Sequence, residues 1–149
     1  MLSESARETV ILYIGALNAR DIERALAYVA RDVVLDPVLF EERGAAGLRL
    51  SLRTMLRAIP DACLTLADLV VEDERVAARA TLRGTQTGML ETRTLRLPAT
   101  GRELAIEQHM LFRIVDGLIV ELRISRDDFG MLRQLGHLAL AGGAMGWGV

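Results

Sequence analysis

Apolar residues at the start of the chain recur at the spacing of an amphipathic helix. Between Ala6 and Leu17 they return every three or four positions, which predicts a helix with Ser5 as its N-cap and an end near Asn18. Asp21 can cap a second helix over residues 22–30. The chain is therefore expected to open with two helices joined by a short turn.

A single strand and a third helix follow. The segment 33–38 is short and rich in Val, which predicts a strand. Residues 47–59 carry an apolar stripe that predicts a helix, which Pro60 ends. From Ala62 onward the period changes to two, which indicates a meander of antiparallel strands. These strands are predicted over residues 62–71, 75–88, 102–115 and 118–125.

Alternation along the strands also assigns the two faces of the sheet. In the strand from residue 102, Gln108, Met110 and Phe112 share the apolar face, and Leu122 and Ile124 share it in the last strand. The apolar face thus carries two amides, Gln86 and Gln108, and the first helix is expected to cover it. A buried amide requires hydrogen-bond partners.

Asp127 and Asp128 open a final helix, where carboxylates suit the N-terminus. The order of elements predicts an α+β fold in which a curved antiparallel sheet packs against the N-terminal helices. We expect one domain over residues 1–136 and a Gly-rich C-terminal tail over 137–149, mobile or packed on a partner, with the lone Trp147.

Composition narrows the classes of function. The chain has 149 residues, 51% of them hydrophobic, and a net charge of −2, so it can bury a core. Its 18 basic residues are all Arg and alternate with acids, which argues against a nucleic-acid interface. No apolar run suggests a membrane span, and one Cys with no signal peptide indicates a cytoplasmic protein. Neither metal-ligand spacing nor a phosphate loop is present, so no cofactor is expected.

One carboxylate stands out against this background. Asp36 lies in the apolar stretch 31–40, directly before Pro37. A charge in such a strand is costly unless it is paired or used in a cavity. It could also simply end the strand by bonding to nearby backbone amides.

Three phrases in the right order carry a resemblance to a known family. They are "YIGALNARDIERALAYVARDVVLDPV", the pair "GTQTG" and "LPATGREL", and "FRIVDGLIVELRISRDDFGMLRQLG". The chain resembles the nuclear transport factor 2-like superfamily, a cystatin-like roll, and within it the SnoaL-like polyketide cyclases. The resemblance implies a cone-shaped sheet around an apolar pocket, and commonly a homodimer formed through the outer face of the sheet.

The N-terminal half is also similar to ketosteroid isomerases. In those enzymes the Asp of a "DPV" phrase is the general base and a Tyr of the first helix donates to the oxyanion, which by resemblance implies Asp36 and Tyr13. A third group, a protonated Asp, falls at Met110, which cannot donate. That oxyanion hole is incomplete unless Gln108 or Gln86 substitutes.

In SnoaL-like cyclases the acid/base Asp precedes the closing helix, which implies Asp127 here. Arg123 stands where that family has a Trp, and Gln86 where it has a His. Two of the catalytic candidates have simpler interpretations: Asp127 as an N-cap only, and Tyr13 as a core residue with a satisfied hydroxyl. The chain therefore leaves open which Asp, if either, is catalytic.

We expect from these observations a cofactor-independent enzyme that acts on a small hydrophobic carbonyl compound, with polyketide cyclisation by intramolecular aldol attack as the first hypothesis. An isomerase, dehydratase or epoxide hydrolase on the same fold, and a small-molecule-binding protein without catalysis, are the alternatives. The catalytic candidates are Asp127, Asp36 and Tyr13. The substrate-binding candidates are Gln86, Gln108, Met110, Phe112, Leu122, Ile124, Phe40 and Leu56.

Overall fold

The computed structural model describes residues 2–138, with side chains from Glu4 onward. Residues 139–149, and with them Trp147 and most of the predicted C-terminal tail, lie outside the described residues. The elements of the described chain, in order, are α1 (Leu2–Asn18), α2 (Ile22–Leu26), β1 (Val29–Asp36), α3 (Gly44–Ala58), β2 (Cys63–Glu72), β3 (Arg75–Thr85), β4 (Leu90–Glu91), β5 (Arg96–Leu97), β6 (Glu103–Val115), β7 (Leu118–Arg126) and α4 (Asp128–Gln134).

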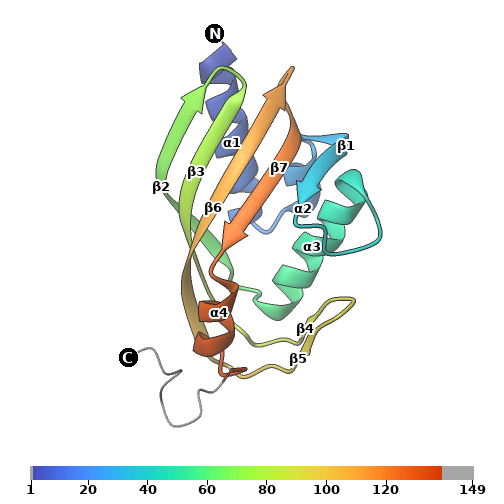
Figure 1. The fold of residues 1–149 in the computed structure, drawn as a ribbon, viewed down its shortest axis with the longest axis vertical. Helices are drawn as coiled ribbons and strands as arrows, with labels where there is room; N and C mark the ends of the chain where they lie inside the picture. Colours follow the sequence, from blue (N-terminus) through green and yellow to red (C-terminus); the bar gives the residue numbers. More distant parts are fainter. Residues whose placement is uncertain (1, 139–149) are drawn as a thin grey trace.

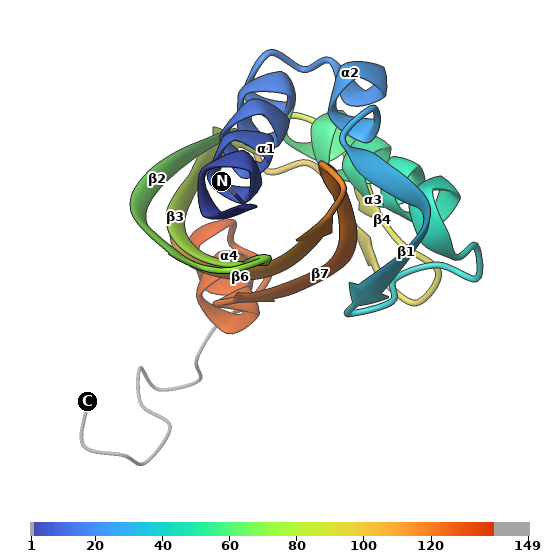
Figure 2. The same cartoon turned by 90° about the horizontal axis from the view of Figure 1, so that it is seen from above.

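A strongly bent five-stranded sheet forms the body of the molecule. Its strand order is β1-β7-β6-β3-β2, in which β1 runs parallel to β7 and the other pairs are antiparallel, and β4 and β5 make a small separate hairpin. Figure 1 shows the long strands curving past one another, and Figure 2 shows α1 lying in the hollow of the sheet. The predicted curved sheet covered by an N-terminal helix is confirmed.

Three local predictions hold and four shift. Asp21 caps α2 as expected, since its side chain accepts from the Arg24 amide at 3.0 Å. Asp127 caps α4 in the same way, and the Asp116-Gly117 turn, with both residues at positive φ, joins β6 to β7. The shifts concern the ends of the N-terminal elements and the connection between β3 and β6.

Helix α1 starts at Leu2 rather than after Ser5, which lies within the helix. Strand β1 begins at Val29 instead of residue 33 because Val29 already pairs with Ile119 of β7. Helix α2 is correspondingly shorter than predicted. The connection between β3 and β6 contains the β4–β5 hairpin, whose strands have two residues each and leave no periodic signal.

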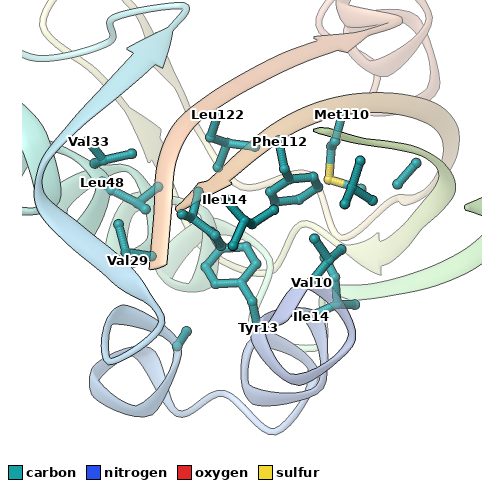
Figure 3. Close-up of a cluster of buried hydrophobic side chains, with 14 of the residues drawn as sticks. Val10, Tyr13, Ile14, Val29, Val33, Leu48, Met110, Phe112, Ile114 and Leu122 are labelled. Carbon is teal, nitrogen blue, oxygen red and sulfur yellow. The ribbon is translucent and has the colours of Figure 1, made fainter. Parts of the chain in front are cut away.

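The predicted faces of the sheet are confirmed by burial. Along β6 every second residue is buried, from Leu104 to Ile114, whereas Glu107 and His109 are exposed. Val10 and Tyr13 of α1 pack on this inner face, as the close-up in Figure 3 shows. The sheet therefore has an apolar inner face and a polar outer face.

The core divides into two clusters along the sheet. The first, between α1 and the sheet, includes Met110 and Phe112, and the second, beside α4, includes Ile106. Apolar side chains of α3 and β2 that pack against these clusters are only partly buried: Leu52, Met55, Leu56, Leu64 and Leu66. Gln108 lies on β6 between Ile106 and Met110, and so at the boundary of the two clusters.

A substitution at Gly84, with Gly15 as the control, tests the packing of the second cluster. A Cβ added at Gly84 of β3 would lie 2.2 Å from Cγ2 of Ile59, a fully buried side chain that has no room to move. We expect Gly84→Ala to destabilise the protein by about 1–3 kcal/mol. Gly15, on the exposed side of α1, has no atom within 4 Å of its ideal Cβ. Gly15→Ala is the matched control and should stabilise by about 0.5–1 kcal/mol. Urea denaturation checks both, and equal effects would contradict the packing described.

Candidate functional site

Four of the predicted site residues meet on the inner face of the sheet. Tyr13 of α1 sets its ring edge against Phe112, with ring centroids 6.0 Å apart and planes at 73°. Met110 and Leu122 lie beside them and are also buried (Figure 3). The structure thus brings together a phenol and an apolar wall that the sequence alone placed on separate elements.

Burial controls the chemistry of the Tyr13 hydroxyl. The residue is 2% exposed, and removal from water raises the pKa of the phenol well above its usual value. The hydroxyl therefore stays protonated at physiological pH. It can act as a hydrogen-bond donor, and it is not suited to act as a base.

The two predicted glutamines have different surroundings. The amide nitrogen of Gln86 donates to the carbonyl oxygens of Gly88, Leu97 and Pro98 at 3.1, 3.1 and 3.2 Å. Its oxygen accepts from Nε2 of His137 at 2.7 Å. Gln86 is therefore fully engaged with the backbone of the β4–β5 region and the C-terminal end of the described chain.

Gln108 has no such engagement. Three polar residues of the described chain are buried, and of these Thr9 and Gln86 make side-chain hydrogen bonds, whereas the Gln108 amide makes none to any residue among 4–138. In the same part of the chain, every polar side-chain atom sealed from solvent has a partner. Gln108, which is 4% exposed, therefore has hydrogen-bonding capacity that residues 4–138 leave unused.

Arg126 is a neighbour of Gln108 that the sequence analysis did not select. The two residues are directly paired across β6 and β7, so their side chains share the inner face. The Arg126 side chain is only 16% exposed, and its Nε lies 3.3 Å from Oδ1 of Asp128. Extending the alternation of Leu122 and Ile124 by one step would have assigned Arg126 to this face.

Asp36 lies on the other side of the sheet. It pairs with Arg123 of β7 in the strand register, and its carboxylate is 65% exposed, 3.8 Å from the Arg123 guanidinium. Both residues line an open groove of about 460 Å³ on the outer face. Asp36 can lie in an apolar strand because its side chain is on the outer side of the sheet, which faces solvent.

Asp127 also faces solvent. Its Oδ1 accepts from the Gly130 amide at 2.8 Å, so it caps α4, and its neighbour Asp128 holds Arg126 instead. The two acids therefore have separate partners. The structure does not bring Asp127, Asp36 and Tyr13 to one place.

The remaining candidates divide between the inner face and the surface. Ile124 and Leu56 are partly buried and pack against the two core clusters. Phe40 instead lines a second groove, of about 580 Å³, on the side of α3 that also carries Arg53 and Arg57. Phe40 is thus separated from the other apolar candidates.

The inner face carries hydrogen-bond donors among apolar side chains, and no carboxylate is buried there. The buried residues of the described chain include no Asp or Glu, and the polar groups on the face are the Tyr13 hydroxyl, the Gln108 amide and the Arg126 guanidinium. Each can donate a hydrogen bond to oxygen. Among residues 2–138, no group of three or more His, Cys, Asp or Glu side chains could hold a metal ion. No helix in that range is long and apolar enough to cross a membrane.

A bent sheet that encloses the first helix and carries its polar groups on an apolar inner face defines a nuclear transport factor 2-like α+β protein. The chain belongs to the SnoaL-like polyketide cyclase family, whose model matches residues 7–135. No curated protein sequence matches the chain.

Solved structures agree with this assignment. TsrD from Streptomyces laurentii is 32% identical, with a TM-score of 0.79, over 91% of this chain and 97% of that chain. IdmH, a putative polyketide cyclase from Streptomyces antibioticus, is 28% identical, with a TM-score of 0.74, over 88% and 98%. AclR, a putative hydroxylase from Streptomyces galilaeus, is 24% identical, with a TM-score of 0.77, over 93% and 89%, and shares the fold.

The contrast between the two glutamines can be measured. Gln86→Leu should destabilise the protein by about 1–3 kcal/mol, because it leaves the carbonyls of Gly88, Leu97 and Pro98 without their donor. Gln108→Leu should change stability by less than about 0.5 kcal/mol or increase it, because no side-chain hydrogen bond within residues 4–138 is lost. Thermal and urea unfolding of both variants would measure the difference. A large loss in Gln108→Leu would show that its amide has a structural role.

Proposed function

We propose that the protein is a cofactor-independent enzyme that binds a small hydrophobic carbonyl compound of polyketide type and promotes its ring closure by intramolecular aldol attack. The observation that supports this proposal is the presence of the Tyr13 hydroxyl and the Gln108 amide on an apolar face, in residues that are 2% and 4% exposed and make no side-chain hydrogen bond within residues 4–138. Such groups suit the oxygen of a bound ligand. We expect the enzyme to work in the cytoplasm, in secondary metabolism.

In this mechanism the inner face holds the carbonyl oxygen. Ring closure begins with removal of a proton from the carbon beside a carbonyl, which places negative charge on the oxygen as the enolate forms. A donor fixed in an apolar surrounding stabilises that charge strongly, and one such donor is worth about 3–4 kcal/mol in other enzymes. Tyr13 can serve because burial keeps its proton in place.

The proton acceptor must lie outside the buried inner face, because none of the buried residues among those described is Asp or Glu. Asp127 is our first candidate by its position before α4, and one of its oxygens is used by the Gly130 amide, which leaves the other for a proton. The substrate would have to extend from the inner face to the end of β7. Asp36 is the second candidate, and it would be reached only from the outer groove.

Ligand binding without catalysis is a second candidate function. It is favoured by the absence of any buried Asp or Glu among the described side chains. Thermal stabilisation by a panel of apolar ketones and epoxides would report binding, and product analysis would separate catalysis from it. The same panel covers the isomerase, dehydratase and epoxide hydrolase alternatives, for the last of which the Arg126–Asp128 pair offers an ion pair but no third group.

Three matched substitutions test the acid/base assignment. Asp127→Asn should lower kcat at least about 100-fold, because Asn caps a helix nearly as well as Asp but cannot accept the proton. Asp36→Asn tests the second candidate in the same way. Asp73→Asn is the control, because it removes an exposed charge from the turn between β2 and β3, and it should keep kcat within about threefold. Turnover of an open-chain polyketide-type diketone, followed by chromatography, measures all three. Unchanged rates in both Asp127→Asn and Asp36→Asn would show that neither carboxylate accepts the proton.

We also propose that the protein is a homodimer formed through the outer face of the sheet. That face combines exposed apolar side chains, Val70 at 65% and Leu111 at 37%, with ion pairs such as Arg79–Asp68 at 2.7 Å. A face that mixes both charge signs with apolar groups can meet its own copy without net repulsion.

Substitution on that face should therefore change the mass in solution. Leu111→Glu is expected to convert a dimer to a monomer in analytical ultracentrifugation at micromolar concentration, because the introduced charge would be buried twice. Leu95→Glu is the control, since Leu95 is 40% exposed and lies in the connection between β4 and β5. A monomeric wild type, or an unchanged mass in Leu111→Glu, would contradict the proposed interface.

A further inference from the structure

Two neighbouring groups on the inner face have unused hydrogen-bonding capacity. Gln108 of β6 is 4% exposed and its amide has no partner among residues 4–138, and it lies directly across from Arg126 of β7. Directly opposed residues in an antiparallel pair have Cβ atoms about 4.5–5.5 Å apart, so the amide and the guanidinium stem leave the sheet side by side.

The Arg126 guanidinium is only partly compensated. Asp128 is the carboxylate within 4 Å of it among the described residues, with 3.3 Å from Nε to Oδ1, and that Asp is 70% exposed. Arginine has five N–H donors, and one carboxylate in water uses at most two and stabilises little. A side chain that is 16% exposed therefore retains donors that solvent, or a ligand, must satisfy.

A buried amide that only stabilises the fold would be expected to have both its nitrogen and its oxygen bonded within the protein. Gln86, the other buried glutamine, has its amide nitrogen and oxygen both bonded within the fold. Gln108 lies between the two core clusters, where Ile106 and Met110 flank it and a side chain such as Leu would pack without cost. An unpartnered amide beside a partly unpaired Arg is the donor set that binds a carboxylate, because the planar guanidinium matches its two oxygens.

We propose that Arg126 and Gln108 form a subsite that binds a carboxylate carried by the hydrophobic ligand, with the rest of the ligand on the apolar inner face. The substrate class is thereby narrowed to hydrophobic carbonyl compounds that bear a carboxylic acid. The inference rests on the proposed ligand binding at the inner face and does not depend on turnover. Asp128 positions the guanidinium through Nε and leaves the remaining donors for the ligand.

Paired probes test the subsite directly. Anthraquinone-2-carboxylate and the neutral anthraquinone-2-carboxamide have nearly the same shape, and isothermal titration calorimetry gives both affinities. The wild type should bind the carboxylate at least about tenfold more tightly than the carboxamide. Arg126→Gln should remove this preference while the affinity for the carboxamide changes less than about threefold. Gln108→Leu should lower the preference about two- to tenfold.

Arg123→Gln is the matched control, because Arg123 has the same charge on the same strand but lies on the outer face. It should keep the preference. Equal affinities of the wild type for both probes, or an equal loss in Arg123→Gln and Arg126→Gln, would overturn the subsite. If Arg126→Gln does not fold, Arg126→Lys replaces it: the charge remains but the planar fork is lost, so the preference should fall severalfold, and an unchanged preference would overturn the proposed geometry.

The result of this binding experiment can be distinguished from the result of the activity test of the proposed function. A protein that prefers the carboxylate but turns over no substrate would support the subsite and contradict the cyclase proposal. A protein that cyclises neutral ketones without any preference for the carboxylate probe would do the reverse.

Discussion

The contact between α1 and the hollow of the bent sheet determines the remaining features of the inner face. The edge of the Tyr13 ring on Phe112 fixes the depth at which the helix lies, and an aromatic pair of this geometry adds about 0.5–1.5 kcal/mol beyond the area it buries. Because α1 covers only the first cluster, the sheet continues beyond it with Gln108 and Arg126 uncovered by the helix. The boundary between the apolar and the polar part of the inner face therefore lies where α1 ends its cover of the sheet.

The same arrangement separates the two kinds of charge in the protein. Acidic side chains of the described residues lie at exposed or half-buried positions, where water or arginines compensate them, as in the Asp36–Arg123 pair. The polar groups on the inner face can all donate hydrogen bonds. A surface of donors with no buried carboxylate is suited to a ligand that brings its own oxygen, as carbonyl, enolate or carboxylate.

Much of the fold was predictable because period-two alternation and capping residues are local signals. The inner-face assignment of Met110 and Phe112, and the caps at Asp21 and Asp127, needed only the spacing of neighbouring residues. The site was less predictable. Asp36 and Leu35 are adjacent in β1, but which side faces solvent depends on the pairing of β1 with β7, which is more than eighty residues away in the chain. Gln86 and Gln108 have the same side chain and similar burial, and only the folded surroundings distinguish their roles.

The hydrogen bonds of Gln86 have a consequence for the end of the described chain. Its NH₂ group donates to backbone carbonyls, which assigns the orientation of the amide and leaves its oxygen as an acceptor only. Nε2 of His137 must then donate the proton of the 2.7 Å contact with that oxygen. One amide thus joins the end of β3, the β4–β5 hairpin and the last described residues of the chain.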